Sequence, residues 1–125
     1  MDYISLGPIV CINLDRNSNN NKHIDDIIIN CSNGTLCLYY TTSCCEESYF
    51  LDFDDKALVG KIIESIILSS SGYDGPDTED EDKYCIEDKI YTITFTDTTT
   101  HDLTLRCRSN GCYSTSLLQN IKLNN

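Results

Sequence analysis

Hydrophobic and polar residues alternate along much of the chain, and this pattern predicts antiparallel β-strands. Residues 9–14 form a first short apolar run. Two further runs, 26–31 and 35–40, flank Asn33-Gly34, a dipeptide typical of a tight two-residue hairpin loop. Both faces of this predicted ribbon carry apolar side chains, so we expect it to lie in the centre of a sheet rather than at an edge.

A two-residue loop at Asn33-Gly34 determines which residues face each other across the ribbon. The expected pairs are Cys31 with Leu36, Ile29 with Leu38, and Ile27 with Tyr40. In this register Cys31 and Cys37 lie on opposite faces, so a disulfide bond between them is not expected.

A second ribbon is predicted in the C-terminal third, where residues 91–95 and 103–107 alternate between apolar and polar. Their apolar faces match if a three-residue loop lies at Thr98–Thr100. The expected pairs are Phe95 with Leu103, Ile93 with Leu105, and Tyr91 with Cys107.

The chain is expected to end as a meander. A tight turn at Asn110-Gly111 leads into a third strand, 112–118, and the tail 121–125 is expected to fray. Two polar stretches, 15–23 and 69–83, contain almost nothing to bury and are predicted to be mobile loops.

The segment 57–68 is ambiguous. Its apolar residues recur at helical spacing, which favours an amphipathic helix, whereas its many isoleucines favour a strand. Periodicity alone favours the helix, and the choice between strand and helix for 61–69 stays open. Together these patterns predict an α+β fold that is mostly antiparallel β. We expect two hairpins or a meander, five to seven strands, and at most one or two short helices.

Composition narrows the class of protein. The 125 residues fit a single domain, 1–125. The net charge of −11 argues against direct nucleic-acid binding, because affinity for a phosphate backbone comes from Lys and Arg. No signal-peptide pattern opens the chain and no apolar run is long enough to span a bilayer, so we expect neither secretion nor a membrane partner. The eight cysteines are then expected to be reduced.

Reactive side chains crowd together in the stretch 41–55, which contains the adjacent cysteines Cys44 and Cys45 followed by two glutamates. Neighbouring cysteines on a strand point to opposite sides, so ordinary packing is the default interpretation. Zinc is the one metal left open, because Cys107 and Cys112 would complete a site with Cys44 or Cys45. Nearby negative charge disfavours a thiolate and argues against a redox thiol. No cofactor is expected.

An enzyme is not expected. A Cys/His nucleophile pair would need His23 or His101 beside the cysteine pair, yet both border polar loops, where a solvated histidine is the ordinary outcome. No glycine-rich phosphate loop or metalloprotease motif occurs. The acidic run 77–82 also lacks the glycine that a calcium-binding loop requires.

Three short motifs resemble a family of small domains common in tailed phages and also found in other large DNA viruses. They are Ser43-Cys44-Cys45-Glu46, Leu58-Val59-Gly60 and Ser109-Asn110-Gly111-Cys112-Tyr113-Ser114. Ser43 and Cys112 depart from the family pattern, which often has an acidic residue and usually has a tyrosine there. The resemblance, over residues 9–121, implies a mostly antiparallel β domain in which 61–69 is a strand. It implies no activity, because none is assigned to the family.

The viral resemblance, together with an isoleucine-rich and alanine-poor composition typical of AT-rich genomes, favours a small acidic viral accessory protein. We expect it to act in the host cytoplasm as a non-catalytic protein-binding module, since tyrosine is enriched at interfaces. The candidate interaction residues are Tyr39, Tyr40, Glu46, Tyr49, Phe50 and Tyr113. The alternatives are a thiol-redox or zinc-binding protein and a minor structural component packaged in the virion.

Overall fold

Eight β-strands make up most of the molecule. The computed structural model describes residues 2–16, 23–40, 46–51, 53–76, 85–109 and 116–124. The strands are β1 (Ile9–Arg16), β2 (Ile24–Cys31), β3 (Gly34–Tyr40), β4 (Glu46–Phe50), β5 (Ile63–Pro76), β6 (Cys85–Phe95), β7 (Thr100–Ser109) and β8 (Leu117–Leu123). Two single 3-10 turns, η1 (Ile4–Leu6) and η2 (Lys56–Leu58), complete the described elements. The predicted mostly antiparallel fold is confirmed, although the described strands number eight rather than five to seven and the described residues contain no α-helix.

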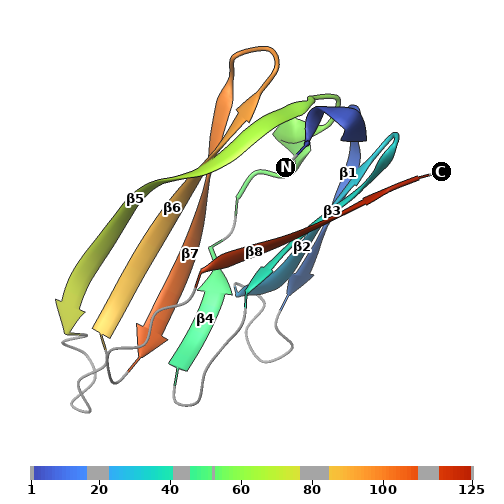
Figure 1. The fold of residues 1–125 in the computed structure, drawn as a ribbon. Coiled ribbons are helices and arrows are strands. Elements are labelled where there is room, and N and C mark those ends of the chain that lie inside the picture. The colour runs from blue at the N-terminus through green and yellow to red at the C-terminus, as the bar shows by residue number, and fades with distance from the viewer. Residues whose placement is uncertain are drawn as a thin grey trace.

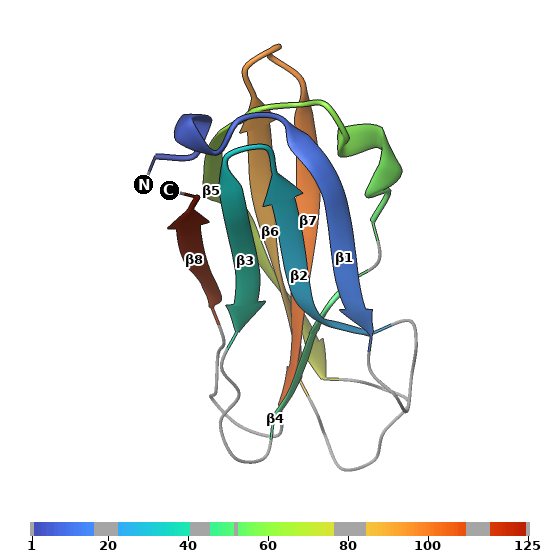
Figure 2. The same ribbon diagram turned by 90° about the vertical axis from the view of Figure 1, so that its right-hand side faces the viewer.

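The strands form one curled sheet whose two halves face each other as layers (Figure 1; Figure 2). The sheet order is β5-β6-β7-β4-β2-β3-β8, and β1 pairs with the other side of β2. One layer holds β8, β3, β2 and β1, and the other holds β5, β6 and β7. The short β4 connects the layers, because it pairs with β7 along its length and with β2 at Ile24 opposite Phe50.

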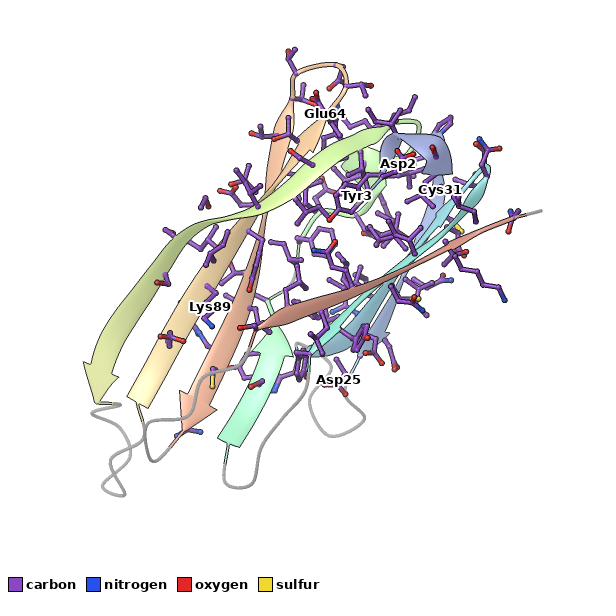
Figure 3. The ribbon with its side chains drawn as sticks, viewed as in Figure 1. Asp2, Tyr3, Asp25, Cys31, Glu64 and Lys89 are labelled. Carbon is purple, nitrogen blue, oxygen red and sulfur yellow. The ribbon has the colours of Figure 1, made fainter. Side chains whose placement is uncertain are left out.

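The core lies between the two layers and takes its side chains from the inward side of each strand. Burial alternates along Ile27–Cys31 of β2 and along Gly34–Leu38 of β3, which is the pattern of a sheet with one covered face. The N-terminal segment helps to close the space between the layers, since Tyr3 is buried and its hydroxyl donates to Gln119 of β8 (Figure 3). The largest fully buried side chains are Phe50, Phe95, Leu6, Ile9, Ile24, Ile27, Ile29, Leu36, Leu38, Ile63, Ile93 and Leu103.

The β2–β3 hairpin has its predicted faces but not its predicted register. The structure pairs Cys31 with Gly34, Ile29 with Leu36, and Ile27 with Leu38. The loop is therefore Ser32-Asn33, one residue earlier than predicted. Because each partner is displaced by two residues, every side chain keeps its face of the sheet. The predicted central position is confirmed, since β2 lies between β1 and β3.

Contacts from outside the hairpin account for this register. The Asn33 N–H donates to the carbonyl of Leu6 at 2.9 Å, so the N-terminal turn holds the loop in place. A Cβ atom on Gly34 would lie 2.5 Å from the carbonyl oxygen of Lys122 in β8. Gly34 is thus required by the close approach of β8 to β3, whereas the sequence pattern assigned it to the turn.

The β6–β7 hairpin has the predicted three-residue loop, two residues earlier in the chain. The structure pairs Ile93 with His101, Tyr91 with Leu103, and Lys89 with Leu105. The loop is Thr96–Thr98, and Thr98 has a φ of 73°, the left-handed conformation found in three-residue hairpin loops. Asp97 favours this loop, because its carboxylate accepts hydrogen bonds from the Thr99 N–H at 3.0 Å and the Thr99 hydroxyl at 2.5 Å.

The contacts of the Asp97 carboxylate are expected to make a contribution to stability that is lost in acid. Its carboxylate lies 2.8 Å from Nζ of Lys61. Hydrogen bonds from Lys61 and then from Thr99 lower the pKa of Asp97 from 3.8 to about 2. Because the folded-state pKa is the lower one, this contribution is complete above the unfolded value of 3.8 and is lost as the pH falls to about 2.

We therefore expect the urea midpoint of the wild type to fall more steeply than that of Asp97→Asn as the pH drops through this window. Asp54 is exposed, and Asp54→Asn is the matched charge control. The urea midpoint of this variant should fall with pH as steeply as that of the wild type. If the urea midpoints of the wild type and of Asp97→Asn change identically with pH, Asp97 does not make the acid-sensitive contribution.

The segment with helical spacing is a strand, so the helix that periodicity favoured for 57–68 is wrong. Only the single turn η2 is helical there. The register shifts between Ile63 and Ser65, which makes Glu64 an extra residue on β5. Ile63 and Ile66 are consequently both buried, three positions apart. A bulged strand thus imitates the spacing of an amphipathic helix, and residues 63–69 form the strand that the resemblance implied.

Parts of both stretches that were predicted to be mobile loops belong to strands. β5 continues to Pro76, so residues 69–76 are strand and the remainder of the loop predicted at 69–83 lies outside the described residues. Asp15 and Arg16 belong to β1, and 17–22 lie outside the described residues.

The predicted C-terminal meander is wrong in its strand pairing. β8 pairs with β3, with Ile121 opposite Leu36, and the second neighbour of β7 is β4. Residues 121–123, which were expected to fray, are therefore part of the sheet. The turn predicted at Asn110-Gly111 lies outside the described residues. Among the described residues there is no helix with the length and hydrophobicity needed to span a membrane.

Candidate functional site

The stretch 41–55, where the sequence gathers its reactive side chains, contributes β4 at the junction of the two layers. Within β4, Ser48 pairs with Cys107 and Phe50 pairs with Leu105. The candidates that lie outside the described residues are Cys44, Cys45, Cys112 and Tyr113. Their roles as zinc ligands or interaction residues stay predictions. Glu46 pairs with Ser109 of β7 through its backbone.

The described aromatic candidates do not form one surface. Phe50 is 0% exposed and its ring meets Tyr40 edge to face at 5.4 Å, so Phe50 packs the core instead of offering contact area. This corrects its assignment as an interaction residue. The Tyr40 hydroxyl lies 2.5 Å from the carbonyl oxygen of Ser48 and 3.1 Å from the carboxylate of Asp25, which is labelled in Figure 3. Tyr39 is half-buried on the other face of β3.

Tyr49 lies at the end of a polar row that crosses three strands. Its ring stacks on His23, with ring centroids 3.6 Å apart and an interplanar angle of 4°. Tyr49 pairs with Arg106, and Arg106 pairs with Asp88. Nε and Nη2 of Arg106 donate to the two carboxylate oxygens of Asp88 at 2.8 and 2.9 Å. This bidentate contact raises the pKa of Arg106 and fixes the outer side of β6 against β7.

Sequence reasoning missed the Arg106–Asp88 pair because of the register error in the second ribbon. The predicted register places Arg106 opposite Thr92, whereas the observed one places it opposite Asp88. Opposite charges that face each other across strands stabilise a register. The predicted register gives Arg106 no acidic partner, so a search for such pairs would have disfavoured it, although the loop 97–99 would pair Asp88 with Arg108 equally well.

The two histidines each contact an aromatic ring, and the described cysteines range from the exposed Cys11 to the buried Cys31. His23 stacks on Tyr49, and His101 lies 5.4 Å from the ring of Phe53. Cys31 is buried and Cys37 lies on the opposite face of the ribbon, as predicted. Burial raises the pKa of the Cys31 thiol, which makes its thiolate scarce.

The zinc candidate Cys107 is buried in β7, at 3% exposure. The ladder brings one further cysteine position near it, because Cys85 pairs with Ser109 while Glu87 pairs with Cys107. Within the described part of the chain, no group of three or more His, Cys, Asp and Glu residues is arranged to hold a metal ion.

The longest run of exposed residues within a described strand lies on β5. This strand pairs with β6 on one side and with no described strand on the other. Residues 67–71 are all exposed, with Ile67 at 58% and Leu68 at 51%. Successive side chains of a strand point to opposite faces, so a run of five exposed residues means that neither face is covered there. Figure 1 shows β5 running away from the layer that holds β8 and β1.

Comparison of the chain with family models, with curated proteins and with solved structures finds no match. The viral resemblance rests on its three short motifs and stays a prediction. A function therefore has to be inferred from the geometry of the described surfaces, above all from the open edge of β5.

Proposed function

We propose that the protein is a non-catalytic protein-binding module and that it binds its partner along the open edge of β5. The observation that carries the proposal is the exposure of residues 67–71 on a strand with a hydrogen-bonded neighbour on one side. The motif resemblance and the acidic composition support a small viral accessory protein that acts in the host cytoplasm.

An edge strand presents main-chain N–H and C=O groups that lack a neighbouring strand, and an extended segment of another protein can pair with them. Ile67 and Leu68 are adjacent, so their side chains point to opposite faces of the sheet. An added strand would therefore cover one exposed apolar side chain on each face. Burial of apolar surface would add to the free energy of the main-chain hydrogen bonds.

The edge of β5 is long and lacks lysine, two of the points that matter for strand addition, although its register with β6 shifts at three places. Features that normally prevent strand addition include lysines, short strands and bulges. β5 contains no Lys or Arg, and its central bulge is confined to Ser69, whose hydroxyl donates to the carbonyl of Ile90 at 2.9 Å. On either side of Ser69, residues 65–68 and 70–73 pair with β6 in regular register. Two regular stretches of edge are thus available to a partner.

Ile67→Lys tests the proposal, with Val10→Lys as its matched control. Both residues lie in strands and both are 58% exposed, so the two variants change charge equally at equal exposure. We expect affinity-tagged wild-type protein to recover a specific partner from cells that express the gene. Ile67→Lys should lower the affinity for that partner at least about tenfold, which corresponds to a loss of about 1.4 kcal/mol of binding free energy. Val10→Lys should leave it unchanged.

Unfolding by urea provides the control for folding, and both variants should match the wild type within about 0.5 kcal/mol, as exposed substitutions do. Recovery of a partner that both variants bind equally would place binding elsewhere on the molecule. Recovery of nothing beyond the background of the untagged protein would argue against a binding module altogether.

A further inference from the structure

Two carboxyl groups face each other across the first pair of strands. β1 and β2 are antiparallel, and their register places Asp15 directly opposite Asp26. Asp15 is exposed and Asp26 is half-buried. Directly opposite residues of neighbouring strands share a face, and like charges there destabilise the pairing of the strands. An ionised pair would therefore work against the end of β1.

The two side chains nevertheless make contact. A side-chain hydrogen bond joins the carboxyl groups of Asp26 and Asp15. An ionised carboxylate can only accept hydrogen bonds, so this bond requires a proton on one of the two groups. Two carboxyl groups that share a site hold one proton tightly, because the charge of the first group disfavours ionisation of the second.

A third carboxylate also favours the bound proton. Burial raises the pKa of Asp26 above its ordinary value of 3.8, and the charges of Asp15 and Asp25 raise it further. Asp25, labelled in Figure 3, accepts a hydrogen bond from the Tyr40 hydroxyl at 3.1 Å. Both neighbouring carboxylates therefore oppose the ionisation of Asp26.

The other titratable and charged groups at this end of the sheet come from the ends of β1 and β2 and from β3. Arg16 ends β1 and lies beyond a shift in the register, and His23, which precedes β2, stacks on a ring of β4. On the outer face of β3 the titratable side chains are Cys37 and Tyr39, and neither is a cation. Among the described residues, the charges that act on the pKa of Asp26 are carboxylates. A proton on the pair relieves their repulsion.

We propose that Asp15 and Asp26 share one proton and that this proton joins the end of β1 to β2. The register of the two strands shifts directly after this pair, so the pair is the last one in the regular part of the ladder. Loss of the proton leaves two negative charges opposite each other and loosens the end of β1. The pair therefore makes a pH-sensitive switch, which is independent of the β5 edge in the other layer.

The direction of the pH dependence follows from the raised pKa of Asp26. The contribution of the shared proton to stability is complete below the unfolded value of 3.8, and it is lost as the pH rises through the higher folded value. The contribution of Asp97 has the opposite sign, because it is lost as the pH falls. The two effects can thus be told apart in one pH series.

The carboxyl carbon chemical shifts of the two aspartates test the shared proton. We expect the wild-type pair to titrate in two separate steps, one below 3.8 and one above it, because the proton that remains after the first step is held by both groups. In Asp15→Asn, Asp26 should titrate in one step, at a lower pH than the upper step of the wild type. Two groups that titrate independently in the wild type, each in one step near 3.8, would overturn the shared proton.

Urea unfolding of the two single variants tests the effect on stability. Asp15→Asn and Asp26→Asn each remove one of the facing charges, so at pH 7 their urea midpoints should be at or above that of the wild type. As the pH falls, the wild type should gain stability relative to both variants. Asp97 is present in all three proteins, so its own loss in acid cancels. The exposed Asp54→Asn is the matched control and should show no such relative gain against the wild type. An unchanged difference between wild type and Asp26→Asn at every pH would overturn the switch.

Hydrogen exchange locates the effect on the chain. After correction for the intrinsic effect of pH on exchange, the amides at the end of β1 should gain protection in acid in the wild type and not in Asp26→Asn. The amides of β5, in the other layer, should respond equally in both proteins. A pair that titrates in two steps while the end of β1 responds equally in both proteins would mean that the proton is shared but does not join the strands, and the switch would be overturned.

Discussion

Replacement of Phe50 by alanine is expected to lower the free energy of unfolding by about 3–5 kcal/mol. Phe50 is 0% exposed. It pairs with Leu105 of β7 and with Ile24 of β2, so it lies where the two layers of the sheet join. Small domains unfold with a total of about 5–15 kcal/mol, so this variant would keep a narrow margin of stability.

Tyr39→Ala is the matched control for Phe50→Ala, since it also removes an aromatic ring from a strand. Tyr39 is half-buried on the outer face of β3, and its loss should cost less than about 1.5 kcal/mol. Urea denaturation followed by circular dichroism measures both variants. If the two variants lose equal stability, Phe50 is not a buried contact between the two layers. The prediction that Phe50 is an interaction residue would then stand again.

The alternation of apolar and polar residues predicts which face of the sheet a side chain lies on better than it predicts which residue lies opposite on the next strand. Both hairpins have the predicted inward and outward residues, because displacements by two or four residues preserve the face of every side chain. The partners differ because contacts that alternation does not encode select the loops. In one hairpin the loop is held by Leu6, and in the other it is capped by Asp97.

The long-range pairings could not be read from local patterns. β8 adds to β3 rather than to β7, and β4 meets β2 at a single pair of residues. Such contacts between distant segments depend on the packing of the whole sheet, which no short motif describes. The meander predicted at the C-terminus was the simplest local solution, and the two-layer arrangement replaced it.

The candidate site was missed for a related reason. Ile67 and Leu68 belong to the longest apolar run near the middle of the chain, and the pattern assigns such residues to a core. Their exposure follows from the divergence of β5 from the opposite layer (Figure 1). The point at which β5 extends beyond the opposite layer depends on how the whole sheet is assembled. The sequence therefore identifies the apolar residues but not the surface that they form.

Gly34→Ala is expected to lower the free energy of unfolding by about 1–3 kcal/mol, with the damage concentrated at the β3–β8 edge. The added Cβ would lie 2.5 Å from the carbonyl oxygen of Lys122 and 2.8 Å from Cδ2 of Leu6. The first atom belongs to the backbone of β8, and the second belongs to a side chain that is 0% exposed. Neither can give way without moving a strand or the core.

Gly60→Ala separates this steric effect from the ordinary conformational cost of losing a glycine. Gly60 has a φ of 89° with nothing within 4 Å of an added Cβ, so the variant should lose about 1–2 kcal/mol through backbone strain alone. Hydrogen exchange distinguishes the two variants. The amides of 117–123 should lose protection in Gly34→Ala and keep it in Gly60→Ala, because only the former displaces β8. Unchanged protection of β8 in Gly34→Ala would mean that the glycine serves the turn, as the hairpin motif alone suggests, and that β8 does not approach β3 this closely.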